Sequence, residues 1–411
     1  MSRIFKRAIF ITLLLGFGSH SLRADYHFWN VILLVHQSRG LNNLWGYTQD
    51  GREYALVVRN EDRNPYFESF QVIDITIPNS PQTIAEFPSR YYYMHEVETY
   101  KNYAYTNSGQ IFDLSYLPDS VREVGASKIL CHTLTIQDDY CYCNEGNLVI
   151  FDLTNPLSPV AVATINTGGW VHDSFVRKDT LFIADIAGDT FGGILIYDVQ
   201  DKANPVFLKK ITYPNSFTHS CWTTEDGKYL LTCDENIGGH LKVWDIQDLN
   251  NIQLVSEFKT NSNAIIHNVY VKGDFAYIAY YTDGLRVLRI KDPAQPEEVG
   301  YYDTTPYDKA DYEGAWGAYP YLPSGNILVS DISCGLYILK FEVRGGDYDS
   351  DSSITFVDII FLVDYLFRNG PAPKPVEAGD VNSDCKVNLG DVIYLVNYLF
   401  KDGPPPPPAC F

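Results

Sequence analysis

The sequence predicts an all-β fold for most of the chain, followed by a small α-helical module at its C-terminal end. The first observation is a strand-turn-strand phrase that recurs seven times between Trp45 and Glu342. The second is the composition, with 31 Tyr and 22 Phe against 2 Met, because aromatic residues favour β-strands. The third is an acidic segment, "GDYDSDSSITFVDIIFLVDYLF" from Gly346, which is nearly repeated from Gly379.

The charge of the chain limits its partners. The 411 residues carry a formal net charge of −20 at pH 7. Nucleic acids and anionic membrane surfaces are bound by clustered Lys and Arg, and this chain has an excess of acidic residues. We therefore expect no nucleic acid among its partners.

Residues 1–24 have the pattern of a signal peptide. Basic residues precede an apolar stretch over residues 8–17, and Ala24 offers a cleavage site. The apolar stretch is too short for a stable membrane anchor, and no later stretch has the length to span a bilayer. We expect a secreted or cell-surface protein with no transmembrane anchor after cleavage.

The recurring phrase predicts the architecture. It is an apolar strand that ends at Asp or its equivalent and continues through a turn into a second strand, as in "GNLVIFDLTNPLSPVAVATI". A further hairpin precedes each copy, so each unit has about four strands. The units begin at Trp45, His95, His132, His172, His219, His267 and Trp316. Seven such units predict a seven-bladed β-propeller over residues 25–343, with a β-solenoid or a pair of β-sandwiches as the alternatives.

The phrase resembles the LVIVD repeat of bacterial secreted proteins. Longer segments, among them "HEVETYKNYAYT" and "GAWGAYPYLPSGNILVSDISCGLYIL", resemble the choice-of-anchor B family over residues 40–341. The resemblance implies an exported repeat region joined to a C-terminal attachment device. It implies no reaction, because the family has no established biochemical activity.

The two acidic segments have the spacing of calcium-binding loops. Ca²⁺ takes about six to eight oxygen ligands, and a loop of about twelve residues presents them at alternate positions and at its last position. The predicted ligands are Asp347, Asp349, Asp351, Ser353, Thr355 and Asp358 in the first loop, and Asp380, Asn382, Asp384, Lys386, Asn388 and Asp391 in the second. Lys386 contributes its backbone carbonyl. Ser352 and Cys385 replace the usual Gly, so each must adopt an unusual backbone angle. We expect two bound Ca²⁺ ions.

Each loop runs directly into an apolar helix that ends at a Gly-Pro segment. This arrangement, with Asp at the twelfth position, resembles the dockerin family and implies a dockerin-like domain over residues 346–403, followed by a Pro-rich tail over residues 404–411. In that family one helical face binds a cohesin module. The recognition positions imply that Phe356, Val357, Leu389 and Gly390 bind the partner. These residues depart from the family's Ser-Thr type, and packing of the module on the propeller is the alternative role.

Five histidines occupy the same place in five successive units. They are His95, His132, His172, His219 and His267. The first strand of each blade lines the channel of a propeller, so these side chains are expected to converge there, joined by Glu96 and Asp173. Neutral imidazoles with a carboxylate suit a transition metal such as Zn²⁺, Cu²⁺ or Fe²⁺. The alternatives are a hydrogen bond between blades that recurs with the repeat, and direct acid-base catalysis.

Eight cysteines in an exported chain are candidates for disulfide bonds. We expect a cross-strand bond between Cys221 and Cys233, which flank the turn "TTEDGK". The further candidate pairs are Cys131 with Cys143, for which Cys141 competes, and Cys385 with Cys410.

The sequence favours a binding or display protein over an enzyme. Repeats and tail are both typical of interaction domains, and the sequence contains no nucleophile elbow or phosphate loop. The propeller would present a surface to a glycan or protein ligand, and the tail would attach it to a cohesin-type partner. The alternative is an extracellular, metal-dependent hydrolase, lyase or oxidoreductase that acts at the channel histidines, for example on a polysaccharide.

Overall fold

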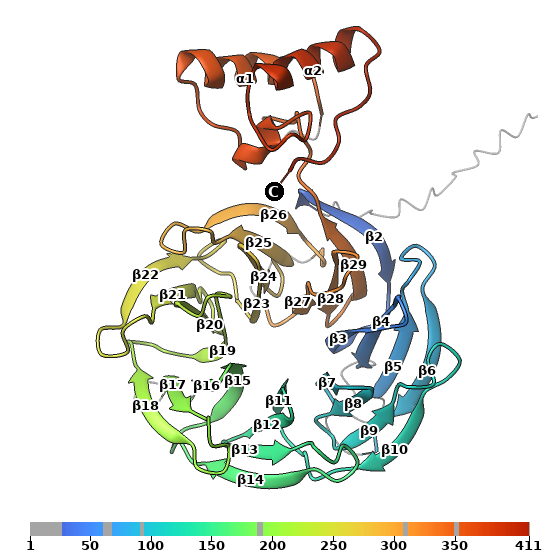
Figure 1. The fold of residues 1–411 in the computed structure, drawn as a ribbon, viewed down its shortest axis with the longest axis vertical. Helices are drawn as coiled ribbons and strands as arrows, with labels where there is room; N and C mark the ends of the chain where they lie inside the picture. The colour runs from blue at the N-terminus through green and yellow to red at the C-terminus, as the bar shows by residue number, and fades with distance from the viewer. Residues whose placement is uncertain are drawn as a thin grey trace, which may run out of the picture.

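The computed structural model describes residues 27–60, 68–90, 94–186, 192–306, 311–348 and 353–410. The predicted signal peptide, residues 1–24, lies outside these ranges. The described strands form seven antiparallel sheets around a central channel, and two α-helices form a separate module outside the ring (Figure 1). The prediction of a seven-bladed β-propeller followed by a small helical module is confirmed.

Each blade is a meander whose innermost strand lines the channel (Figure 1). The first blade contains β3 (Leu41–Gln49), β4 (Arg52–Arg59), β5 (Ser69–Asp74) and β6 (Gln82–Pro88). The second contains β7 (Val97–Tyr100), β8 (Tyr103–Thr106), β9 (Gln110–Asp113) and β10 (Arg122–Ala126). The third contains β11 (Thr133–Gln137), β12 (Tyr140–Glu145), β13 (Asn147–Asp152) and β14 (Val160–Ile165). The fourth contains β15 (Val171–Arg177), β16 (Thr180–Asp185), β17 (Gly193–Asp198) and β18 (Val206–Ile211).

The last three blades follow the same order, with additions from the start of the chain. The fifth contains β19 (Thr218–Thr223), β20 (Tyr229–Asp234), β21 (Leu241–Asp245) and β22 (Gln253–Phe258). The sixth contains β23 (Asn268–Lys272), β24 (Phe275–Ala279), β25 (Leu285–Arg289) and β26 (Glu297–Tyr302), and β1 (Phe28–Trp29) adds a fifth strand to it. The seventh contains β27 (Ala315–Tyr319), β28 (Asn326–Asp331) and β29 (Gly335–Phe341), with β2 (Val31–Gln37) as its outer strand.

Strand β2 closes the ring. It pairs antiparallel with β29, about 300 positions later in the chain, so the last blade is built from both ends of the propeller sequence. Val31 at the start of β2 is fully buried in the cluster that joins the sixth and seventh blades. The closing strand therefore contributes core packing as well as backbone hydrogen bonds.

The Asp that recurs in the repeat phrase has a local structural role. The Asp that ends the third strand of a blade accepts, through Oδ1, the backbone N–H two residues later, as Asp152 does from Thr154 at 2.7 Å and Asp198 from Gln200 at 2.8 Å. Such a side-chain turn ends the strand and starts the connection to the outer strand. In the sixth blade Arg289 takes this place.

The C-terminal module contains α1 (Phe356–Arg368), a 3₁₀ turn η1 (Val376–Gly379) and α2 (Leu389–Phe400). Its small core includes Leu362 of α1 and Leu395 of α2. Each helix begins with a capping box, in which Thr355 or Asn388 caps the first turn and an aspartate three residues later caps back. Within the described residues, neither helix has the length and apolar character to cross a bilayer.

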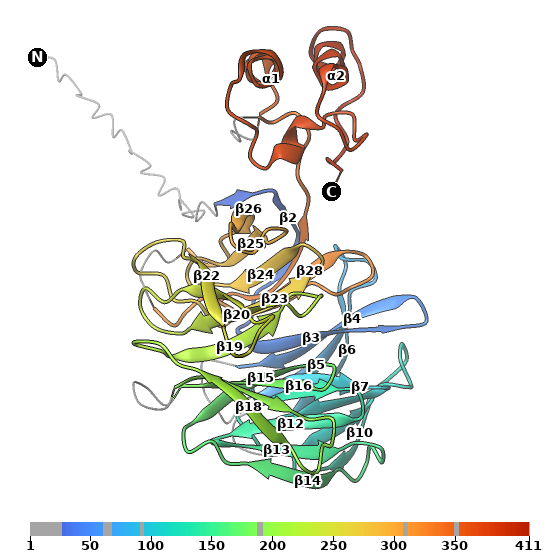
Figure 2. The same ribbon diagram turned by 60° about the vertical axis from the view of Figure 1, so that its left-hand side comes forward.

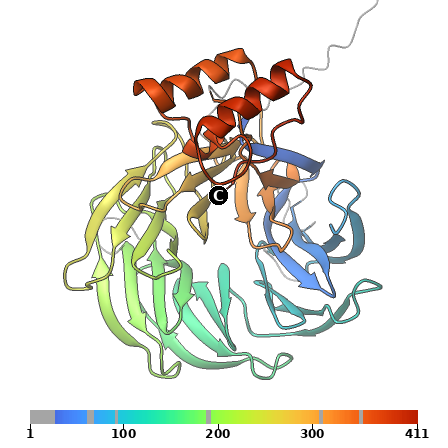
Figure 3. The same cartoon turned by 45° about the horizontal axis from the view of Figure 1, so that its top comes forward.

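The helical module touches the propeller at one edge, next to β2 and β26 (Figures 2 and 3). Arg289 of the sixth blade forms an ion pair with Glu377 of η1. Val343, just after β29, is fully buried with Ala378 and Ala409, and its carbonyl accepts the N–H of Ala409 at 2.9 Å. The Pro-rich tail therefore returns to the joint between the two domains.

The expected disulfide between Cys221 and Cys233 is wrong, because both cysteines are free and buried. The turn pairs Thr223 with Leu230, so Cys221 lies opposite Thr232 and Cys233 lies opposite Ser220, one residue away from the expected register. A shift of one residue sends two side chains to opposite faces of a sheet. Accordingly, Cys221 packs against the fourth blade and Cys233 against the sixth.

Candidate functional site

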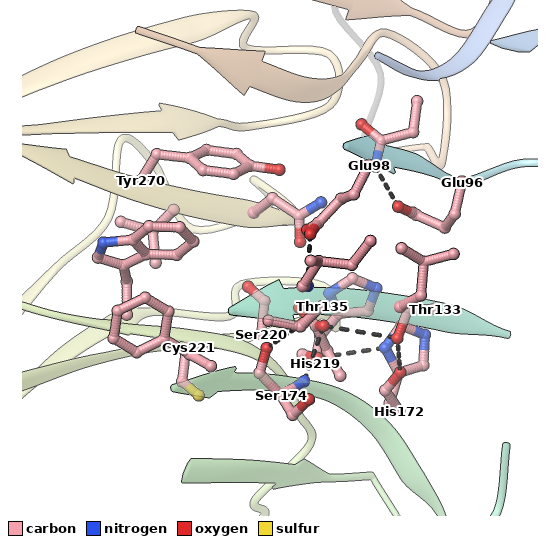
Figure 4. Close-up of a pocket in the computed structure, with 18 of the residues that line it drawn as sticks. Glu96, Glu98, Thr133, Thr135, His172, Ser174, His219, Ser220, Cys221 and Tyr270 are labelled. Atoms are coloured by element: carbon pink, nitrogen blue, oxygen red, sulfur yellow. Dashed lines mark hydrogen bonds between the residues drawn. The ribbon is translucent and has the colours of Figure 1, made fainter. Parts of the chain in front are cut away.

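A cavity of about 240 Å³ lies in the channel of the propeller. Its lining includes three carboxylates and several aromatic side chains, namely Glu96, Glu98, Asp173, Trp45, Trp222, Tyr270 and Tyr321. Figure 4 shows the hydroxyl of Tyr270 pointing into this space. No Lys or Arg is among the described residues that line it. The cavity therefore suits a neutral or cationic ligand better than an anion.

The three carboxylates are held by hydrogen bonds from neighbouring groups. Glu96 accepts from the side chain of Asn43 at 2.5 Å, and Glu98 accepts from the backbone N–H of Ile136 at 2.5 Å. Asp173 accepts the N–H of the next residue at 2.7 Å. Burial raises the pKa of Glu96 and Glu98 well above the usual range and raises the pKa of Asp173 to about 7. Of the three, Asp173 is therefore poised to exchange a proton near neutral pH.

The five predicted histidines form a continuous arc across five neighbouring blades, and all five line the cavity. The ring centroids of successive members are 4.8, 4.4, 3.9 and 4.2 Å apart. Burial lowers the pKa of His95, His219 and His267 to about 3. The imidazoles are therefore neutral at pH 7, with one lone pair each.

Hydrogen bonds determine which nitrogen carries the proton in three of these rings. His172 Nδ1 donates to the carbonyl of His219 at 3.2 Å, because a carbonyl can only accept. His172 Nε2 must then accept from His132 Nε2, 2.8 Å away. His267 Nδ1 likewise donates to the carbonyl of Trp316 at 2.5 Å. These contacts between adjacent blades match the alternative interpretation of the repeat.

A β-bulge explains how the side chains reach the channel. The register of the inner strand shifts around His172, around His219 and around Trp316. A bulge turns a side chain away from its usual alternation. In the first blade the shift spans Asn42 and Asn43, so these asparagines, and not Trp45, occupy the corresponding place.

Glu96 and Asp173 were expected to join the histidines, and the structure brings them into the same cavity. Their hydrogen bonds go to Asn43 and to the backbone of Ser174. Among the described residues, one group of His, Cys, Asp or Glu side chains is close enough to share an ion, and it consists of His219, His267 and Glu235. Glu235 was not predicted as a ligand, because it directly follows β20 and belongs to no recurring pattern.

The two predicted calcium loops have the same internal bonding. Asp358 Oδ1 accepts the N–H of Tyr348 at 2.8 Å, and its Oδ2 accepts the N–H of Thr355 at 2.7 Å. Asp391 accepts in the same way from Val381 and Asn388, both at 2.8 Å. The carboxylate of the twelfth residue thus bonds to both the start and the end of its loop. Asp347, Ser353 and Thr355 of the first loop lie in the described residues, whereas Asp349, Asp351 and Ser352 lie outside them.

The second loop fits a hard divalent cation. Asp380, its first residue, accepts the N–H groups of Asp384 and Cys385, and Asn382, Asp384, Lys386 and Asn388 follow at the alternate positions. Asp380 and Asp391 are buried, and within the described residues neither forms an ion pair with Lys or Arg. Burial and the nearby Asp380 raise the pKa of Asp391. A divalent cation would balance these two buried carboxylates.

Two further features of this loop follow from its sequence. Cys385 adopts the expected unusual backbone angle, with a φ of 63°. Cys385 also forms a disulfide with Cys410, one of the candidate pairs, and Cys410 N–H donates to Asp380 at 3.3 Å. The end of the chain is therefore fastened to the second loop.

The residues predicted to bind a partner lie at the starts of the two helices. Phe356 and Leu389 are 58% and 53% exposed, and Val357 and Gly390 beside them are partly exposed. Each helix carries two more exposed apolar side chains at equivalent places, and these are Ile360 and Phe367 on α1, and Ile393 and Phe400 on α2. The exposed apolar face is therefore present twice.

Comparison with known proteins identifies both parts of the chain. The model of the LVIVD repeat matches residues 132–167 and 266–304, and the model of the dockerin type I domain matches residues 345–400. The chain carries LVIVD repeats and a dockerin type I domain. The wider resemblance to the choice-of-anchor B family stays a prediction.

Among solved structures, the propeller is similar to a protein from Bacteroides fragilis that its description assigns as a 6-phosphogluconolactonase. The TM-score is 0.54 at 14% identity, over 69% of this chain and 88% of the other. At this identity the likeness shows the fold alone. A search of curated proteins found no significant match.

The match to the dockerin type I domain indicates the kind of cofactor and the kind of partner. Such domains bind Ca²⁺ and dock with cohesin modules, and they occur in extracellular or cell-surface proteins. The number of ions, their ligands in this chain and the contact residues are proposals that rest on the geometry above.

Proposed function

We propose that the chain is an exported binding protein whose dockerin domain attaches it to a cohesin-bearing partner and whose propeller channel holds a ligand. The observation that carries this proposal is the duplicated apolar face of the dockerin helices. An exposed apolar patch beside a folded metal loop is typical of an interaction surface. Because the loops position both helices, docking depends on Ca²⁺, with two ions held by the twelve loop residues named above.

Capture of the full-length protein on immobilised type I cohesin modules tests the attachment. We expect capture in Ca²⁺ and release by a chelator. Replacing Phe356 and Leu389 together by Ala weakens capture about 30-fold, as loss of an interface hot spot does. The control is Phe207→Ala, which removes an aromatic side chain of similar exposure, 53%, from the propeller. Unchanged capture by the double variant would place the contact elsewhere, and no capture by a panel of cohesins would overturn the attachment.

The channel supports a polyhydroxylated ligand such as a glycan. Aromatic faces and carboxylates line the cavity together, and the described lining has no Lys or Arg to attract an anion. A phosphorylated substrate, as named for the Bacteroides fragilis protein, therefore suits this channel poorly. Retardation of the protein in gels that contain soluble polysaccharides measures this binding, and Tyr270→Ala should abolish it. Equal retardation of this variant would move the glycan site out of the channel.

A second candidate function is an extracellular enzyme that works in the same channel. Glu96, Glu98 and Asp173 have raised pKa values, and a protonated carboxyl beside an ionised one can act as acid and base on a glycosidic bond. Release of new sugar ends from a polysaccharide would support the enzyme, provided that Asp173→Asn loses it. Binding without release supports the display function.

A further inference from the structure

We propose that His219, His267 and Glu235 form a binding site for a divalent transition metal such as Zn²⁺ at the histidine arc of the propeller. One ligand atom of each residue lies within 4.8 Å of the others. The site lies between the fifth and sixth blades and is distinct from the calcium loops of the dockerin domain. It goes beyond the attachment function and does not depend on it.

The separations of the ligand atoms leave room for an ion. His219 Nε2 is 3.7 Å from Glu235 Oε2, and His267 Nε2 is 4.0 Å from Glu235 Oε1. Both distances are too long for a hydrogen bond. Ligand atoms at a tetrahedral zinc ion stand about 3.4 Å apart when the bonds are about 2.1 Å. Each histidine is therefore within a few tenths of an ångström of the separation from Glu235 that a shared ion requires.

Hydrogen bonds fix the tautomer of His267 and the orientation of the Glu235 carboxylate. His267 Nδ1 donates to the carbonyl of Trp316, so the lone pair is on Nε2, and within the described residues this buried atom has no hydrogen-bond partner. The hydroxyl of Tyr281 donates to Glu235 Oε1 at 2.5 Å and orients the carboxylate. Metal ligands are commonly fixed in this way by a partner on their far side.

His219 is also available as a ligand. Its ring is buried, and its Nδ1 has no hydrogen-bond partner in the described part of the chain, so no contact prevents Nε2 from presenting a lone pair to the ion. His132 and His172 differ in this respect, because their Nε2 atoms bond to each other. Among the described residues, two of the five expected ligands, His219 and His267, lie close enough to a carboxylate to share an ion with it.

The charge balance favours a cation at this point. The side chain of Glu235 is 13% exposed, and among the described residues no Lys or Arg pairs with it. A buried charge is costly unless it is paired, and a divalent ion supplies the missing positive charge. Three protein ligands leave a fourth position open, and both histidines line the cavity, so that position faces a channel ligand.

Metal uptake by the full-length protein tests the site. The protein is stripped with a chelator, returned to excess Ca²⁺ to fill the dockerin loops, and titrated with Zn²⁺, with Co²⁺ as a coloured substitute. We expect the protein to bind one equivalent of Zn²⁺. The absorption spectrum of the Co²⁺ form should be typical of an ion with four or five ligands. Glu235→Gln, which keeps the shape of the side chain, weakens uptake by at least about tenfold, and His132→Asn in the same arc leaves it unchanged.

Tyr281→Phe provides a second and milder test. It leaves all three ligands in place and should weaken Zn²⁺ binding by about tenfold through loss of orientation of Glu235. Circular dichroism checks that each variant is folded. Absence of stoichiometric Zn²⁺ in the native protein, or equal affinity in the native protein and Glu235→Gln, would overturn the site. Cohesin capture is unaffected in either case, so its failure is a separate result.

Discussion

Glu98 is a carboxylate that its surroundings keep from ionising. It lies on the inner strand β7, buried in the channel, and accepts one backbone N–H from the neighbouring blade. Burial raises its pKa well above the usual value of 4.5, and the nearby Glu96 and Asp173 raise it further. The folded protein therefore holds a proton that the unfolded chain releases.

Replacing Glu98 by Gln should change the pH dependence of stability. A raised pKa in the folded state stabilises the fold fully below about pH 4.5, and this contribution is lost as pH rises toward the raised pKa. The native protein thus loses up to about 1.4 kcal/mol per pH unit from this group, and Glu98→Gln does not. In thermal unfolding between pH 4.5 and 7, the stability of the variant relative to the native protein should increase as pH rises. Asp119→Asn on an exposed turn is the control, and a constant difference for Glu98→Gln would contradict the prediction.

The thiols provide a second test at the scale of single residues. Six cysteines are free and two form the bond between Cys385 and Cys410. Thiol titration of denatured, unreduced protein should therefore find six free groups. Replacing Cys385 and Cys410 by Ser should leave this number at six and lower the stability of the dockerin domain by about 3 kcal/mol, since the bond closes a loop of 25 residues. Four or fewer free thiols in the native protein would show a further disulfide.

Among the elements, the loop-helix unit of the dockerin domain occurs twice with the same bonds. In each copy one aspartate, Asp358 or Asp391, accepts N–H groups from the start and the end of its loop and also caps the helix. The same side chain therefore closes the loop and caps the first turn of the helix. Binding of Ca²⁺ to the loop should be coupled to helix formation.

Calcium should increase the helix content of the dockerin domain. Chelation removes the cation that balances the buried carboxylates, so ellipticity at 222 nm should fall and return on addition of Ca²⁺. Asp380→Ala in the second loop should remove about half of this response, because one of the two helices depends on it. Lys386→Ala should keep the full response, since position 7 contributes only its carbonyl. If both variants lost the same share of the Ca²⁺ response, or if the chelator did not change the ellipticity, the predicted calcium loops would be contradicted.

For the whole molecule, the two domains have separate cores and a small shared joint. The propeller is closed by β2 against β29, and the dockerin domain packs around Leu362 and Leu395. Between them lie the ion pair of Arg289 with Glu377 and the small cluster around Val343. The joint is therefore ordered, but it contributes little apolar area to either core.

Deleting residues 346–411 should leave the propeller folded. Strand β29 ends at Phe341, before the cut, so no blade loses a strand. We expect the melting temperature of the propeller to change by only a few degrees, with the loss coming from exposure of Val343. Deleting residues 28–37 should instead unfold it at a much lower temperature, because β2 closes the ring. Unfolding of the first truncation would show that the dockerin domain is part of the propeller core.

The sequence by itself determined the number of blades and the dockerin domain, and it predicted the two calcium loops. Each depends on a pattern that recurs along the chain with fixed spacing, such as the Asp that ends a strand through its own turn or the alternating oxygen ligands of a loop. Periodicity of this kind reflects local bonds, so it can be recognised without the fold.

Only the tertiary structure decided which side chains meet. Strand β2 pairs with a strand about 300 positions later, and Glu235 approaches His219 and His267 from a loop outside the repeat. The turn between β19 and β20 pairs Thr223 with Leu230, and this register places Cys221 and Cys233 on opposite faces of the sheet. Register and ring closure depend on the packing of distant segments, and for that reason the sequence placed the histidines in the channel but could not tell which of them have free lone pairs.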